Sequence, residues 1–201
     1  MWHKDVLTPK YSNWKDTHTN LYNYQDDIYG VIAIHPIEYL DERIPQFIVN
    51  NSYDIIRKLA AFSYKHFNGT TIAITGTTGE FTTKSLLNEL LSINHSVEAT
   101  KENYNSRMEM MLTIANAITN PDYLVLEVSE DKVWHLPETV VTDDVPPDIV
   151  SITSVGSDHQ RTVEETALLK SQLTHGMNYH SYVILNRDMD NFERVYDTIS
   201  N

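Results

Sequence analysis

The sequence contains no cysteine at all, and only six of its 201 residues are glycine. Without cysteine the chain can form no disulfide bond and can use no thiol as a nucleophile, which fits a reducing compartment. No apolar run approaches the roughly 20 residues that a membrane-spanning helix needs. Residues 1–5 lead into no apolar segment of the kind found in secretory signals. We therefore expect a cytoplasmic protein that does not bind membranes.

Positive charge is also scarce, with 15 Lys and Arg against 28 Asp and Glu and a formal net charge of −13. Such an excess of negative charge argues against binding to nucleic acid or to an anionic membrane. Its simplest role is to keep the protein soluble. The hydrophobic content of 41% is enough to bury a real core, and the length fits one main domain.

Short apolar segments alternate with helical patterns along the chain. Strands are predicted over residues 30–34, 46–49, 71–74, 123–128, 149–153 and 182–186. Helices are predicted over residues 51–66, 85–91, 107–117 and 164–173, with apolar faces that include Leu59, Ala60 and Phe62 in the first and Met108, Met111, Leu112 and Ala115 in the third. This alternation predicts a three-layer α/β fold with a mostly parallel sheet and helices on both faces. Residues 1–29 are polar and aromatic and are expected to precede the main domain, residues 30–201.

The most informative segment is the glycine-rich stretch from Thr75 to Lys84, which reads TGTTGEFTTK. It follows a predicted strand and opens a predicted helix, the arrangement in which backbone N–H groups and a helix N-terminus cradle phosphate oxygens. In a working phosphate loop a Lys follows the second glycine and reaches the phosphates, and the next Ser or Thr holds Mg²⁺. Here Glu80 and Phe81 follow Gly79. The sequence thus predicts a phosphate loop that lacks two of its chemical groups.

Other polar residues come at the ends of the predicted parallel strands. Ligands of such sheets bind beyond the carboxyl ends of the strands. The residues at those ends are Thr75, Glu127, Thr153 and Asn186. We expect these four residues to line one crevice.

These segments together resemble the Mur ligases, the cytoplasmic enzymes that add amino acids to peptidoglycan precursors. The loop resembles the family's ATP loop, and Asn103-Tyr104-Asn105 resembles the Asn-rich segment of the branch that adds D-alanyl-D-alanine. Residues 123–127 resemble the strand that ends in a Mg²⁺-binding Glu, and residues 147–159 the strand and turn that present a metal-binding His. Residues 183–188 resemble the segment that contacts the nucleotide. The match covers roughly residues 30–191 and implies the family's central, P-loop-like ATPase domain.

The resemblance implies a role for each matching position. The metal ligands would be Glu127 and His159, and Lys170 would be carbamylated. The nucleotide-binding residues would be Gly76, Thr77, Thr78, Gly79, Thr82, Thr83, Lys84, Asn186 and Asp188, and the substrate-binding residues Asn103 and Asn105. Simpler alternatives stay open: Lys170 as a solvated residue on a helix face, and Asn186 and Asp188 as ordinary turn residues. Glu127 would then be a charged strand end, and the loop a relic turn kept by its glycines.

The chain also departs from the family pattern. Of the N-terminal domain that binds the UDP end of the precursor, only residues 30–50 match, and the C-terminal domain that closes over ATP would begin near Asn201. Replacing the loop Lys by Glu80 loses an attraction to phosphate and adds a repulsion, each about 1–4 kcal/mol at separations near 4 Å. Phe81 removes a hydroxyl ligand for Mg²⁺. ATP and Mg²⁺ are therefore the implied cofactors, and their binding is expected to be weak or absent.

Three functions remain compatible with the sequence. We favour a degenerate relative, or pseudoenzyme, that acts as a non-catalytic or weakly nucleotide-binding subunit beside a complete ligase or another protein. The second function is an active ATP-dependent amide ligase, which would phosphorylate a carboxylate and let an amine attack the acyl phosphate. The third is an excised ATPase domain of such a ligase. Nucleic acid is not an expected partner.

Overall fold

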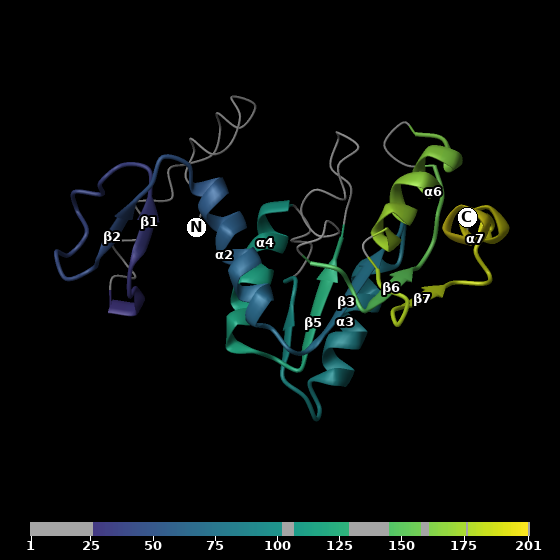
Figure 1. Ribbon diagram of the computed structural model, residues 1–201, viewed down its shortest axis with the longest axis horizontal. Coiled ribbons are helices and arrows are strands. Elements are labelled where there is room, and N and C mark those ends of the chain that lie inside the picture. Colours follow the sequence, from purple (N-terminus) through teal and green to yellow (C-terminus); the bar gives the residue numbers. More distant parts are fainter. Residues whose placement is uncertain (1–25, 102–106, 129–144, 158–160, 176, 201) are drawn as a thin grey trace. The chain divides into compact units, whose positions relative to one another are not determined.

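The computed structural model describes residues 26–101, 107–128, 145–157, 161–175 and 177–200 (Figure 1). The chain divides into two compact units, Met1–Ile56 and Arg57–Asn201, each with a hydrophobic core of its own. None of the helices in the described ranges is long and apolar enough to span a bilayer. In chain order the main elements are β1 (Val31–Ala33), β2 (Gln46–Ile48), α2 (Ser52–His66), β3 (Thr70–Thr75), α3 (Glu80–Leu91), β4 (Val97–Ala99), α4 (Arg107–Asn116), β5 (Tyr123–Glu127), β6 (Ile149–Ile152), α6 (Val163–Ser171), β7 (Tyr182–Leu185) and α7 (Phe192–Ser200).

The first unit contains a parallel pair of short strands. β1 pairs with β2 in the register Val31 to Gln46. The Gln46 side chain bonds both the N–H and the carbonyl of Ile37, at 2.7 and 3.0 Å, and so fixes the connection between the strands. The small core beneath them consists of Ala33, Ile37, Leu40 and Ile44. Both strands were predicted from the sequence, whereas the assignment of residues 30–50 to a remnant domain stays a prediction.

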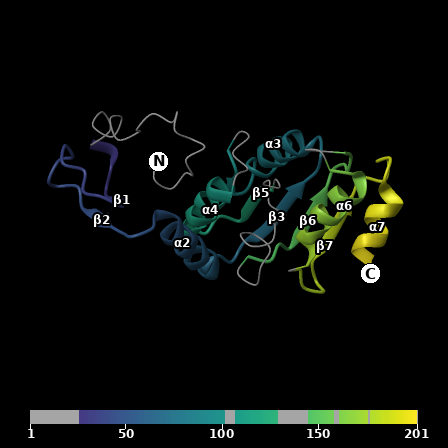
Figure 2. The same ribbon diagram turned by 90° about the horizontal axis from the view of Figure 1, so that it is seen from above.

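The second unit is built on a five-stranded sheet in the order β4-β5-β3-β6-β7, with every neighbouring pair parallel. Figures 1 and 2 show β5, β3, β6 and β7 side by side in this order. The chain passes from β3 through α3 to β4, and then back through α4 to β5. Because parallel crossovers are right-handed, these opposite directions place α3 and α4 on opposite faces of the sheet. The predicted three-layer α/β fold is confirmed.

The central strands are buried on both faces, as their continuous apolar sequences predict. Ile72, Ile74 and Val125 form the core of one face, and Leu87 and Leu91 of α3 pack against them. The alternate residues Ala73, Leu124 and Leu126 are fully buried as well. On α4, Met110, Met111, Ile114 and the following Ala117 are buried.

Some elements differ from the sequence prediction. The helix after the loop begins at Glu80 instead of Ser85, because Gly79 turns the chain into it with a positive φ of 90°. Strand β4 was not predicted, because it is only three residues long and its middle residue is the charged Glu98. Helix α7 was not predicted either. The apolar faces of the helices over 107–117 and 51–66 were predicted in part. Met111 and Ala60 are buried and Met108, Leu112 and Ala115 are half-buried, whereas Leu59 and Phe62 are exposed.

Two isoleucines on parallel strands test this description of the sheet. Ile74 on β3 is fully buried, whereas Ile184 on the edge strand β7 is 56% exposed. Ile74→Ala should lower the free energy of unfolding by about 2–5 kcal/mol, because it removes contacts and leaves a cavity. Ile184→Ala should change it by only about 0.5–1 kcal/mol. Urea denaturation measures both values, and equal losses would contradict the proposed layering.

Candidate functional site

The candidate site lies where the parallel strands end. Thr75 and Glu127 are the last residues of β3 and β5, and Thr153 and Asn186 directly follow β6 and β7. The strand register pairs Ile74 with Glu127, and Ile152 with both Thr75 and Leu185. The four residues therefore lie at one edge of the sheet, and the crevice that they were expected to line stays a prediction.

Both glycines of the loop are required by its geometry. A Cβ atom on Gly76 would lie 2.0 Å from the Oγ1 atom of Thr153, which no real side chain tolerates. Gly79 has a left-handed backbone conformation and is the N-cap of α3. Glycine adopts this conformation without the steric cost that other residues incur. The loop therefore has the backbone geometry that its sequence predicts.

Hydrogen bonds fasten the loop to the segment that follows β6. The N–H groups of Thr77 and Thr78 donate to the carbonyl and the hydroxyl of Ser154, at 3.0 and 2.9 Å. The Thr153 hydroxyl donates to the Thr78 carbonyl at 2.7 Å, and the Gly156 N–H donates to the Thr77 hydroxyl at 2.9 Å. A phosphate group that used the Thr77 and Thr78 donors would have to displace Ser154 from both.

The first turn of α3 is the other part of the loop that can face an anion. No side chain caps this helix at Gly79, and the first N–H groups of a helix have no partner within it. Glu80 and Phe81 occupy this turn, followed by Thr82, which is exposed, and Thr83, whose N–H makes the first helical bond to Gly79 at 2.9 Å. An acidic residue is favourable here for the helix itself. Toward phosphate, the same carboxylate is repulsive.

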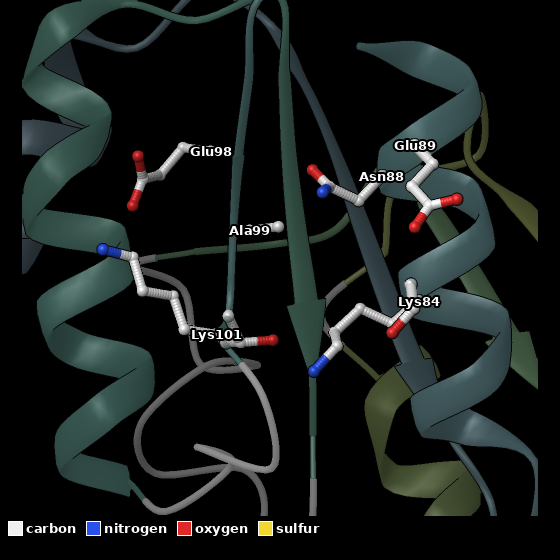
Figure 3. Close-up of a pocket in the computed structure, with 8 residues that line it drawn as sticks. Lys84, Asn88, Glu89, Glu98, Ala99 and Lys101 are labelled. Atoms are coloured by element: carbon white, nitrogen blue, oxygen red, sulfur yellow. The ribbon is translucent and has the colours of Figure 1, made fainter.

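Lys84 and Glu127 form a buried ion pair, with Nζ and Oε2 2.8 Å apart and side chains only 4% and 2% exposed. In Figure 3 the Lys84 ammonium lies at the end of β5. The Phe81 ring lies on this ammonium as well, with its centroid 4.9 Å away. Lys84 was predicted in the nucleotide site and Glu127 in a metal site, and their pairing was not predicted. Lys84 shares its helix face with Leu87 and Leu91, which pack against the core, but the helix was predicted to begin only at Ser85, so this spacing did not reveal the pair.

These residues do not suit a magnesium ion. The Glu127 carboxylate is bound by the Lys84 ammonium, and Phe81 offers no oxygen where a hydroxyl ligand is expected. Within the part of the chain that the structure describes, no group of three or more His, Asp or Glu side chains could hold a metal ion. His159, the other predicted metal ligand, lies outside the described residues, as do Asn103 and Asn105.

Lys170 is buried against the loop instead of lying on a solvated helix face. Its side chain leaves α6, is 1% exposed, and donates from Nζ to the Gly76 carbonyl at 2.6 Å. The simpler expectation of a solvated lysine is therefore wrong. The helical periodicity of the sequence does not reveal that Lys170 is buried, because α6 has buried residues on several sides. Carbamylation of Lys170 stays a prediction.

Asn186 and Asp188 make the turn that follows β7. The Asn186 side chain donates from Nδ2 to the Thr153 carbonyl at 3.0 Å, and its Oδ1 accepts from the Asp188 N–H at 3.0 Å. This is the turn chemistry that Asn and Asp favour after a strand. It also ties the end of β7 to the segment that holds the loop. A contact of either residue with a nucleotide stays a prediction.

An open hollow of about 500 Å³ lies beside the loop helix (Figure 3). Lys84, Asn88 and Glu89 line it from α3, and Glu98, Ala99 and Lys101 line it from β4 and the residue pair after it. This hollow was not predicted from the sequence, because β4, which forms one of its walls, was not predicted. Its lining carries both signs of charge, and Lys84 is the residue that it shares with the loop site.

Comparison with known proteins places these features in one family. The family model described as the Mur ligase middle domain matches residues 74–201. The UDP-N-acetylmuramoyl-tripeptide–D-alanyl-D-alanine ligase of Rickettsia prowazekii is 23% identical over 175 residues, which cover 86% of this chain and 38% of that protein. The corresponding ligase of Synechocystis sp. is 29% identical over 162 residues, or 79% of this chain and 35% of that protein. The chain thus spans less than half the length of these relatives.

A solved structure shows the same likeness in three dimensions. The crystal structure of MurF ligase from Thermotoga maritima in complex with ADP superposes with a TM-score of 0.67 at 26% sequence identity. The match covers 97% of this chain and 44% of that one.

The close approach of Gly76 to Thr153 gives a test of the loop geometry. Gly76→Ala should destabilise the protein by about 1–3 kcal/mol, as overpacking of a tight site does. Gly156→Ala is the matched control, because its Cβ would lie an ordinary 3.7 Å from Thr77. Thermal or urea unfolding measures both. The account is contradicted if the control is the more harmful change, or if Thr153→Ala fails to reduce the cost at Gly76.

The buried contact of Lys170 gives a second test. Lys170→Met should lower the free energy of unfolding by about 1–3 kcal/mol, because the Gly76 carbonyl loses its donor. Lys101→Met, at an exposed lysine, should have little effect in the same urea titration. Equal and small effects of the two changes would mean that Lys170 does not hold the loop.

Proposed function

Because the chain belongs to the Mur ligase family, we propose that it is a middle domain that binds nucleotide weakly and does not transfer phosphate. In this proposal it acts as a binding subunit beside a complete amide ligase of peptidoglycan synthesis or another protein. The relatives by name join D-alanyl-D-alanine to a UDP-N-acetylmuramoyl tripeptide. The family relation supports a role in peptidoglycan synthesis. The replaced residues of the loop support the proposal that the chain does not transfer phosphate.

The observation that carries the proposal is the pair of residues that opens α3. Phosphoryl transfer depends on positioning and on cations that stabilise the charge of the transferring group. Glu80 stands where the loop would supply a cation, and Phe81 where it would supply a metal-binding hydroxyl. Losing a single electrostatic contributor of this kind costs about 10²–10³ in rate. Two such losses leave little of a family-like activity.

The hydrogen bonds of the loop support weak binding for a separate reason. Thr77 and Thr78 already donate to Ser154, so a phosphate gains their N–H groups only by breaking two bonds. The net gain of such an exchange is small. Weak binding would then rest on the first turn of α3, with Gly79, Thr82 and Thr83 at the phosphate end. Asn186 and Asp188 would lie at the nucleoside end, as the resemblance of residues 183–188 to the family's nucleotide-binding segment implies.

The second candidate is an active ATP-dependent amide ligase, or the ATPase part of one. It is favoured by the two buried lysines beside the loop, Lys84 and Lys170. Either ammonium could in principle supply the missing positive charge, and Lys170 could be carbamylated. Asn103 and Asn105 would then hold the peptide substrate. Both lysines, however, are engaged with groups of the protein itself, Glu127 and the Gly76 carbonyl.

Restoring the two lost groups tests the proposal. In calorimetric titrations with ATP and Mg²⁺, the wild-type chain should bind weakly or not at all. The variant Glu80→Lys/Phe81→Thr should bind more tightly by about 1–3 kcal/mol, the worth of a hydrogen bond to a charged group. The matched control is Glu89→Lys/Leu90→Thr, which makes the same two changes at an exposed pair on the same helix. It should leave the affinity unchanged.

Two results would contradict the proposal. One is ATP turnover by the wild-type chain at about 1 s⁻¹, within the usual range of enzymes, which would favour the second candidate. The other is tight wild-type binding that the Glu80→Lys/Phe81→Thr change does not improve.

A further inference from the structure

We propose that the cation of this site is built into the chain: the Lys84 ammonium takes the place of a divalent metal ion at Glu127. The positive charge at this carboxylate is then the Lys84 ammonium, and not a bound magnesium ion. This inference specifies the ionic requirement of the proposed site, and it rests on the proposed function for the identity of the ligand.

The first support is the geometry of the pair. A distance of 2.8 Å between Lys84 Nζ and Glu127 Oε2 is that of a close, direct ion pair. A magnesium ion requires a carboxylate oxygen at about 2.0–2.1 Å. Ammonium and metal ion would repel each other at such short range, so the bound Lys84 ammonium disfavours a metal ion at this carboxylate.

The second support is that the surrounding contacts hold the Lys84 side chain in place beside Glu127. Its helix face also carries Leu87 and Leu91, which pack into the core cluster of β3 and β5. The Phe81 ring covers the ammonium from another side, and a cation over an aromatic face is itself favourable. Turning Lys84 away would leave the Glu127 carboxylate, which is 2% exposed, without its positive partner. Removal of one partner from a buried ion pair is strongly unfavourable.

The third support is that Glu127 is held toward Lys84 by its backbone. The Glu127 N–H donates to the Thr100 hydroxyl at 3.0 Å, and Ile74 lies opposite Glu127 in the sheet. The carboxylate therefore projects from a fixed point at the end of β5. Phe81 and Lys84 together occupy the surroundings that a metal ion and its hydroxyl ligand would need.

Titration with Mn²⁺ alone, followed by electron paramagnetic resonance, tests the inference without any nucleotide. Wild-type protein should show no Mn²⁺ binding that depends on Glu127, so Glu127→Gln should leave the titration unchanged. Lys84→Met releases the carboxylate and should raise the affinity for Mn²⁺ by about tenfold or more, since a nearby positive charge is removed. Lys84→Met/Glu127→Gln should lose this gain. Lys101→Met, a lysine of the same hollow, should behave as wild type.

The outcomes that overturn the inference are distinct from those of the proposed function. Stoichiometric Mn²⁺ binding by wild type that Glu127→Gln abolishes would show that the carboxylate serves a metal. A folded Lys84→Met variant, checked by circular dichroism, that gains no Mn²⁺ binding would also overturn it. If Lys84→Met does not fold, the comparison of wild type with Glu127→Gln decides alone. ATP turnover by the wild-type chain would defeat the proposed function and leave this titration unaffected.

Discussion

A carboxylate at the end of a buried strand needs a positive charge close by, and at the end of β5 that charge comes from helix α3. The ion pair of Lys84 and Glu127 joins the helix that follows the loop to the centre of the sheet. Both side chains are nearly excluded from water, so neither can be lost without leaving the other uncompensated. Together with the packing of Leu87 and Leu91, this contact holds α3 on the sheet and so fixes the direction of the loop.

The loop is also held by hydrogen bonds from the segment that follows β6 and from α6. Ser154 accepts from its backbone N–H groups, and Lys170 donates to the Gly76 carbonyl. Together with the Lys84 pair, these contacts use protein groups at places where a phosphate loop would use phosphate and metal ion. The scaffold of a Mur ligase middle domain is thus retained, while several of its polar groups bind to one another. A binding role follows more readily from such a site than phosphoryl transfer does.

Much of the fold could be predicted from the sequence, because apolar strands that alternate with helices admit few arrangements. The meeting of Thr75, Glu127 and Thr153 at one edge also followed from parallel strand direction alone. The pairing of Lys84 with Glu127 did not, since it depends on where α3 begins and hence on the positive φ of Gly79. The burial of Lys170 was missed because a charged residue on a short helix is usually solvated. In both cases tertiary contacts outweighed the local pattern.

Anomalous diffraction from crystals grown with ADP and Mn²⁺ tests the central claim most directly, because it locates the metal and the side chains together. We predict no anomalous peak at the carboxyl end of β5, with the Lys84 ammonium bound to Glu127 as described. A manganese peak at about 2.0–2.2 Å from the Glu127 carboxylate, within the range of hard divalent cations, would contradict the account. Lys84 would then have turned away, and the site would be that of a metal-dependent nucleotide-binding enzyme.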